Sequence, residues 1–118
     1  MARHLLVIAG WLPPTLNQLT RGKRRARIRG SREARNMVAA FRVRQDVAKA
    51  TGKRRVSADL YYPPGRRRPD VDATQKVLLD ACKQCGLLVN DSPVWCELGP
   101  WQLWRGEMAQ TELTFEDL

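Results

Sequence analysis

Three aspartates and one lysine are the residues of this sequence whose types and spacing most clearly suggest chemistry. Asp70 and Asp72 stand two residues apart in the segment GRRRPDVDATQK, and Lys76 follows four residues after Asp72. Asp91 comes later, in the turn-like stretch LLVNDSPVW. Two or three carboxylates can bind a hard cation such as Mg²⁺, and a lysine beside it can stabilise charge on a phosphate. This pattern is typical of a metal-dependent phosphodiesterase.

The same segment also reads as the start of a helix, without any function. Asp72 and Gln75 fit the N-cap and N3 positions of a capping box, and Asp72 with Lys76 forms an i,i+4 pair with the acid first. Asp70 would then only add negative charge near the helix N-terminus. These residues alone favour the helix-cap interpretation, so the rest of the chain has to decide.

The charge of the chain is positive and unevenly distributed. The net charge is +9; residues 1–60 carry 15 basic and 3 acidic residues (+12), and residues 61–118 carry 6 and 9 (−3). Most of the basic residues are arginine, whose forked guanidinium suits phosphate. This favours a nucleic-acid partner over a merely solvated basic surface. The basic residues that we expect to contact DNA are Arg21, Lys23, Arg24, Arg25, Arg27, Arg66, Arg67 and Arg68.

Length and composition indicate one domain over residues 1–118, with a hydrophobic share of 43% that is ordinary for a globular protein. The longest apolar run, LLVIAG, is too short to span a bilayer and has no signal-peptide pattern. We therefore expect a soluble, cytoplasmic protein with no membrane partner.

CKQC has metal-ligand spacing and His4 is a conceivable fourth ligand, but one CxxC is a weak zinc signal. We expect Cys82, Cys85 and Cys96 to be buried thiols.

The order of predicted elements suggests an α+β fold, with two main helices packed on a small mixed sheet. The apolar run at 4–10 predicts a central strand, and residues of about 20–30 predict a basic arm or β-hairpin. Ser31 and Gly52 mark the ends of a first helix, whose off-core Arg32, Arg35, Arg42 and Lys49 face phosphate or water. Further strands are expected at 55–62, 94–104 and 110–116, with a bulge at Gly99-Pro100.

A second helix is expected from about Asp72 to Gly86. Its core face is Thr74, Val77, Leu78, Ala81, Cys82 and Cys85, so Asp72 and Lys76 point outward. This helix rises about 21 Å, and the five residues from Gly86 to Asp91 return at most ~17 Å. Asp91 therefore joins Asp72 within one subunit only if residues 87–91 run straight back; otherwise Asp91 completes a site across a dimer.

The segment PPGRRRPDVDATQKVLLDACKQCGLLVNDSPV resembles the RusA family of Holliday-junction resolvases. The family pattern is an arginine-rich stretch, Asp-x-Asp, a lysine, a further aspartate, a glycine and a final aspartate. The matching residues here are Asp70, Asp72, Lys76, Asp80, Gly86 and Asp91. The stretch PPTLN is similar to a second element of the family, through Pro13, Pro14, Thr15 and Asn17.

The resemblance implies a homodimer that binds four-way DNA junctions and makes paired symmetric nicks with Mg²⁺, or with Mn²⁺ as the alternative metal. It implies that Asp70, Asp72 and Asp91 bind the metal, that Lys76 contacts the scissile phosphate or helps orient the water, and that Asn17 contacts DNA. Three residues depart from the family pattern, which usually has Asn at Ala73, often an acid at Asn90, and sometimes Arg at Pro69.

The leading hypothesis is a dimeric, Mg²⁺-dependent endonuclease that resolves Holliday junctions. The alternatives are a branched-DNA-binding protein without nuclease activity and a general endonuclease for branched DNA. The first alternative needs the basic half of the chain but not the three acids.

Overall fold

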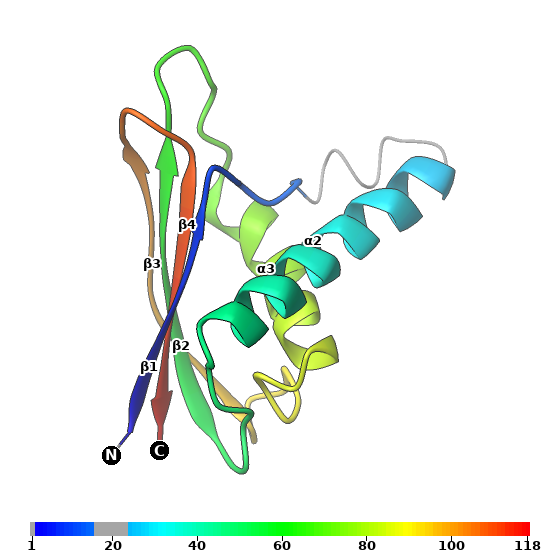
Figure 1. Cartoon of the computed structure of the whole chain (residues 1–118), viewed down its shortest axis with the longest axis vertical. Helices are drawn as coiled ribbons and strands as arrows, with labels where there is room; N and C mark the ends of the chain where they lie inside the picture. The colour runs from blue at the N-terminus through cyan, green and yellow to red at the C-terminus, as the bar shows by residue number, and fades with distance from the viewer. Residues whose placement is uncertain (1, 16–23) are drawn as a thin grey trace.

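A computed structural model describes residues 2–15 and 24–118, and the side chains of residues 24–28 lie outside that description. The described residues form a four-stranded sheet with two helices against one of its faces (Figure 1). The elements are β1 (Arg3–Ala9), α2 (Arg24–Arg44), β2 (Arg54–Tyr62), α3 (Val71–Gln84), β3 (Cys96–Arg105) and β4 (Gln110–Asp117). The strand order is β1-β4-β2-β3, with β2 and β3 parallel and the other pairs antiparallel. The expected α+β fold with a mixed sheet and two helices is confirmed.

The core lies between the sheet and the helices, where alternate strand residues meet the apolar face of α3. In β2 the side chains of Val56, Ala58, Leu60 and Tyr62 are buried, as the alternation predicted. In α3 the predicted core face is also confirmed, since Thr74, Val77, Leu78, Ala81 and Cys82 are buried and Cys85 is half-buried. No helix among the described residues is long and apolar enough to cross a membrane.

The three cysteines are free, and two of them, Cys82 and Cys96, are buried as expected. Burial raises the pKa of all three thiols, including that of the half-buried Cys85. The thiols are therefore uncharged at neutral pH and behave as small apolar groups in the core.

The prediction that residues 4–10 form a central strand is wrong, because β1 lies at the edge of the sheet and, within the described part of the chain, pairs only with β4. Only Leu6 and Ile8 of its apolar run are fully buried, and Leu5 is 54% exposed. The free edge is instead covered by a side chain. Gln45 accepts a hydrogen bond from the Val7 amide (2.9 Å) and donates one to the Val7 carbonyl (2.5 Å).

The predicted ends of the first helix, Ser31 and Gly52, are also wrong. Helix α2 begins at Arg24, so residues 24–29 are helical and form neither an arm nor a hairpin; residues 20–23 lie outside the described residues. The helix ends at Arg44, and Asp46 adopts a left-handed φ of 52° that turns the chain away. The Arg42 guanidinium then donates to the Val47 carbonyl, 3.1 Å away.

The expected bulge at Gly99-Pro100 is confirmed by the shift in register between β2 and β3 at Val56 and Ala58. A Cβ atom at Gly99 would overlap the Ser57 hydroxyl, so any other residue here would require the Ser57 side chain to move. Pro100 is tolerated because β3 is an edge strand and does not need every amide for pairing.

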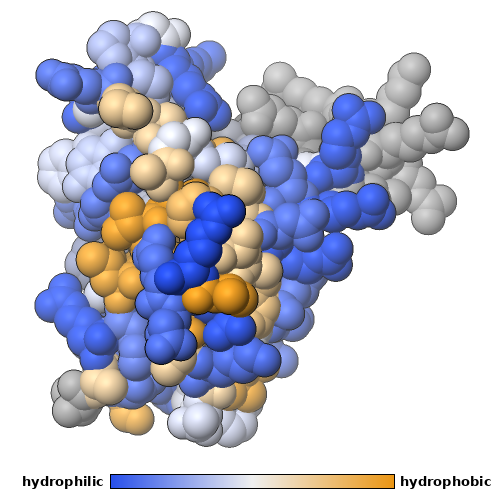
Figure 2. Space-filling model, viewed as in Figure 1, coloured by the Kyte–Doolittle hydropathy of each residue, from blue (hydrophilic) through white to orange (hydrophobic). Residues whose placement is uncertain are grey.

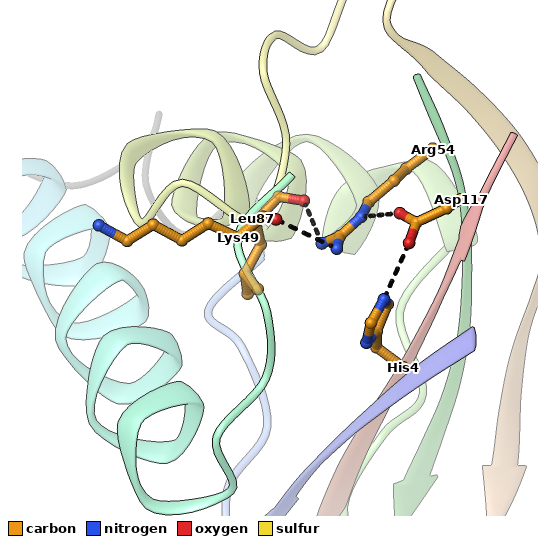
Figure 3. A network of polar contacts seen from close by, with 5 residues as sticks. All are labelled: His4, Lys49, Arg54, Leu87 and Asp117. Carbon is orange, nitrogen blue, oxygen red and sulfur yellow. Dashed lines mark hydrogen bonds and ion pairs between the residues drawn. The ribbon is translucent and has the colours of Figure 1, made fainter. Parts of the chain in front are cut away.

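One buried arginine joins three parts of the chain at the end of the sheet where both termini lie (Figures 1 and 3). Arg54 is 1% exposed; its guanidinium donates to Asp117 Oδ1 (2.7 Å) and to the carbonyls of Leu87 (3.0 Å) and Lys49 (3.4 Å). His4 Nε2 bonds to the other oxygen of Asp117, at 3.0 Å. The strand ends and the segment after α3 are therefore fixed to one guanidinium.

Candidate active site

Asp70 and Asp72 lie at the start of α3, and both side chains are exposed. The N-cap residue is Asp70, with extended φ and ψ, and its side chain makes no capping hydrogen bond. Its carbonyl accepts the Ala73 amide at 3.1 Å. Asp72 is therefore in the first turn and not at the N-cap, so the predicted capping box is wrong. Both carboxylates are available to a ligand.

The first turn of α3 is fixed to the sheet through Thr74. Its hydroxyl donates to the Val71 carbonyl (2.8 Å) and accepts a hydrogen bond from the indole N–H of Trp101 in β3 (3.1 Å). Thr74 is fully buried and Trp101 is 7% exposed. These bonds determine where the turn that carries Asp72 lies relative to β3.

Lys76 lies one turn after Asp72, on the same exposed side of α3. Among the residues that the structure describes, neither Asp72 nor Lys76 takes part in an ion pair within 4.0 Å, so the i,i+4 pair of the helix-cap interpretation does not form. A phosphate bound next to Asp72 would therefore also lie near the ammonium group of Lys76.

The three arginines before Asp70 lie in the loop from β2 to α3, and all three are exposed. The loop begins with a tight turn in which the Arg66 amide donates to the Pro63 carbonyl (3.2 Å) and Gly65 has a φ of 85°. Glycine at this position of a Pro-Gly turn is typical of type II. Arg66 lies over the Tyr62 ring, 6.0 Å from its centroid, and Arg68 donates to the Leu103 carbonyl at 3.4 Å.

Asp91 lies at the opposite end of α3 from Asp70 and Asp72. Its carboxylate is 3.9 Å from the ammonium of Lys83, in the last turn of the helix. Lys83 is eleven residues after Asp72, which corresponds to about 16 Å along the helix axis. Among the described residues, no group of three His, Cys, Asp or Glu side chains lies close enough to hold one metal ion.

The segment around Asp91 forms local hydrogen bonds. The Asn90 side-chain oxygen accepts the Ser92 amide at 3.0 Å, and the Ser92 carbonyl accepts the amides of Trp95 and Cys96. Arg54 holds the preceding Leu87 carbonyl, as described above. Asp91 stays beside Lys83 at the end of α3, so the segment does not run back toward Asp72, which was the condition for a site within one subunit.

Three of the other residues expected to contact DNA, Arg24, Arg25 and Arg27, fall within the first two turns of α2. Asn17, Arg21 and Lys23 lie outside the described residues. The N-terminal half of α2 extends away from the sheet (Figure 1), and the described residues on this side of the molecule are mainly hydrophilic (Figure 2). Arg32 and Arg35 are exposed, as expected, and together with the exposed Arg29 they form the described basic surface of α2.

The positioning roles of three residues in this region were not predicted from the sequence: Thr74, Trp101 and Arg105. The Arg105 guanidinium donates to the carbonyls of Pro63 (3.0 Å) and Arg66 (2.5 Å). Arg105 is brought to this loop by the parallel pairing of β2 and β3, which places it beside Tyr62. That register is a property of the folded sheet.

No family model matches this chain, and no curated protein matches it. The resemblance to RusA resolvases therefore rests on the residues and spacings themselves.

Proposed function

We propose that this protein is a homodimeric, Mg²⁺-dependent endonuclease that resolves four-way DNA junctions by paired nicks. The observation that carries the proposal is the juxtaposition at the start of α3. Two exposed carboxylates, Asp70 and Asp72, follow directly after three exposed arginines. Among the described residues, neither carboxylate has a cation partner. Acids left unpaired beside arginines suit a site where metal and phosphate arrive together.

A second subunit is needed in this proposal, because Asp91 and Asp72 lie at opposite ends of α3. A site then consists of Asp70, Asp72 and Lys76 from one subunit and Asp91 from the other. Exposed apolar side chains flank both halves: Val71 is 39% exposed beside the acid pair, and Val94 and Trp95 are 69% and 39% exposed near Asp91. Burying these groups against a second copy would remove apolar surface from water and bring the halves together.

The oxygen donors of this site fit Mg²⁺, which binds through few carboxylates together with water and phosphate oxygens. Bound there, the metal supplies Lewis-acid stabilisation of the phosphate and a more acidic water. Asp70 and Asp72 of one subunit would hold the metal together with Asp91 of the other subunit. Lys76 donates to a non-bridging phosphate oxygen, stabilising the charge that develops as water attacks and the 3′ oxygen leaves.

DNA binding relies in this proposal on arginine contacts with phosphates from two regions. The loop arginines Arg66, Arg67 and Arg68 hold the strand to be cut, and the basic surface of α2 contacts a neighbouring arm. The affinity should fall steeply with salt, because each neutralised phosphate releases counterions. A two-fold axis in the dimer matches a junction whose two cuts are symmetric.

The test is a cleavage assay with Mg²⁺ on a four-way junction, beside fork, flap and linear duplex substrates of the same sequence. We expect paired nicks on the junction and little cutting of the duplex. Asp72→Asn should lower cleavage at least about 100-fold while binding is kept or tightened, because a negative charge near the phosphates is removed. The matched control is Asp46→Asn, which removes one exposed carboxylate at a left-handed position that asparagine tolerates.

Each other outcome contradicts a defined part of the proposal. Junction binding without cleavage by the wild-type protein would indicate a DNA-binding protein without nuclease activity. Equal cleavage of forks, flaps and junctions would indicate a general branched-DNA endonuclease. Unchanged cleavage by Asp72→Asn would show that the active site lies elsewhere.

A further inference from the structure

Arg105, the last residue of β3, makes contacts that distinguish it from the arginines of the neighbouring loop. Its guanidinium donates to the carbonyls of Pro63 (3.0 Å) and Arg66 (2.5 Å), the first and last residues of the tight turn. The same two residues are joined to each other by the amide–carbonyl bond within the turn, at 3.2 Å. One side chain from β3 therefore fixes both ends of the turn that leads to Arg67 and Arg68.

The backbone at the end of β3 places Arg105 for these contacts. Arg105 lies beside Tyr62 in the parallel register, and the next amide, that of Gly106, donates to the Tyr62 carbonyl at 3.1 Å. A Cβ atom at Gly106 would approach the Tyr61 side chain to 3.2 Å, so this connection is closely packed. The guanidinium thus reaches the loop from a rigid strand, which is a more precise anchor than another loop.

The charge of the loop explains why such an anchor matters. Arg66, Arg67 and Arg68 are exposed like charges at consecutive positions, and none of them has an ion pair among the described residues. Repulsion among them favours a spread loop in the absence of a polyanion. Arg105 opposes this spreading through neutral carbonyls, so it orders the loop without neutralising the positive potential that attracts phosphate.

We propose that Arg105 is a positioning residue that holds the 63–68 turn so that its arginines present the bound phosphate to the acids at the start of α3. This inference rests on the proposed nuclease function. Arg105 acts through the loop backbone, so its charge alone is not sufficient. Both carbonyls accept from one guanidinium nitrogen, Nη1, whose two hydrogens lie in the plane of the group. Lysine at this position keeps the charge but loses this planar geometry, because its ammonium rotates on a flexible stem.

The experiment compares Arg105→Lys and Arg105→Gln with the wild-type protein, using Arg55→Gln as the matched control. Arg55 lies on the other face of the sheet, where it pairs with Glu97 and Glu116, so this control removes the same charge far from the loop. The first measurement is hydrogen exchange of the Arg66 amide in the free protein. We expect both Arg105 variants to exchange about tenfold faster, and Arg55→Gln to exchange like wild type.

The second measurement is steady-state cleavage of the four-way junction with Mg²⁺. We expect Arg105→Lys to lower kcat about tenfold with little change in KM, because charge attraction is kept and phosphate positioning is lost. Arg105→Gln should lower kcat and also raise KM. Wild-type exchange and wild-type kcat in Arg105→Lys would overturn the proposal, since charge alone would then be sufficient.

The two measurements separate this inference from the proposed function. Exchange needs no DNA or metal, so it tests the anchoring of the loop even if the wild-type protein cuts nothing. Faster exchange with an inactive wild-type protein would refute the nuclease and keep the anchor. Active wild-type protein with unchanged exchange in both Arg105 variants would refute the anchor and keep the nuclease.

Discussion

The indole N–H of Trp101 donates to the hydroxyl of Thr74 at 3.1 Å, within the core between β3 and α3. The same hydroxyl donates to the Val71 carbonyl, 2.8 Å away. This chain of two hydrogen bonds links an edge strand of the sheet to the first turn of α3. The orientation of the turn that carries Asp72 therefore depends on a tryptophan almost thirty residues later in the sequence.

Trp101→Phe should lower the free energy of unfolding by about 1–3 kcal/mol, from one lost buried hydrogen bond and the space left by the smaller ring. Chemical denaturation measures this change. Trp104→Phe is the matched control, because the Trp104 indole donates to Asp59 at an exposed position and its side chain is 44% exposed. The control should lose less than about 1 kcal/mol. Equal losses in the two variants would contradict a structural role specific to Trp101.

The features that the sequence predicted correctly depend on local periodicity. The alternation in β2 and the helical spacing of Val77, Leu78, Ala81 and Cys82 each require only that one side of an element faces a core. The end of α3 was also predicted from the sequence, because a glycine, Gly86, follows the helix. In the structure Gly86 has a φ of 79°, and the amides of Gly86 and Leu87 donate to carbonyls of the last turn. These bonds form a Schellman motif.

The features that the sequence did not predict depend on partners distant in the chain. The apolar run of β1 suggested a central strand, but its edge is covered by Gln45, which the pattern does not reveal. The capping signal at Ser31 and the stop signal at Gly52 did not predict the ends of the first helix, which begins at Arg24 and ends at Arg44. The separation of Asp91 from Asp72 follows from the path after α3, which Arg54 fixes through the Leu87 carbonyl.

The hydrogen bonds of Asp117 predict a pH-dependent contribution to stability. Hydrogen bonds from Arg54 and His4 lower the pKa of the Asp117 carboxyl below its ordinary value in the folded protein. A lowered folded pKa means that the ionised form stabilises the fold above the unfolded pKa, and that this stability is lost as pH falls through the folded pKa. The Asp117 side chain is 41% exposed, so solvent screening limits the contribution to about 1 kcal/mol.

The measurement is the difference in unfolding free energy between the wild-type protein and Asp117→Asn across a pH series. The difference should be present near neutral pH and disappear below the folded pKa, where the wild-type carboxyl is protonated. Other carboxylates titrate in both proteins and largely cancel in this difference. A difference that stays constant down to the lowest pH would show that Asp117 does not act through its charge.

Gln45→Ala should expose the edge of β1. The variant loses both hydrogen bonds between the Gln45 amide and the Val7 backbone, which leaves an edge strand ready to pair with another chain. We expect faster hydrogen exchange at the Val7 amide and a loss of about 1 kcal/mol in unfolding free energy. Gln84→Ala, at an exposed position of α3, is the control and should leave Val7 exchange unchanged. Equal protection of Val7 in both variants would contradict the role of Gln45.

Mixed dimers test whether each proposed active site takes residues from two subunits. In a heterodimer of Asp72→Asn and Asp91→Asn subunits, a shared arrangement places both substitutions in one site and leaves the other site entirely wild type. We expect this heterodimer, purified through two different tags, to nick one strand of a four-way junction at about half the wild-type rate, one of two sites being intact. Paired cuts should be absent.

The control is a heterodimer of Asp70→Asn and Asp72→Asn subunits. Both of these acids start the same helix, so each of its two sites contains one substitution whether Asp91 acts within a subunit or across the dimer. This control should be inactive. An arrangement within one subunit predicts that both heterodimers are inactive, because every subunit then has a defective site. Rescue in the first heterodimer together with inactivity in the control therefore requires Asp91 to act on the acid pair of the other subunit.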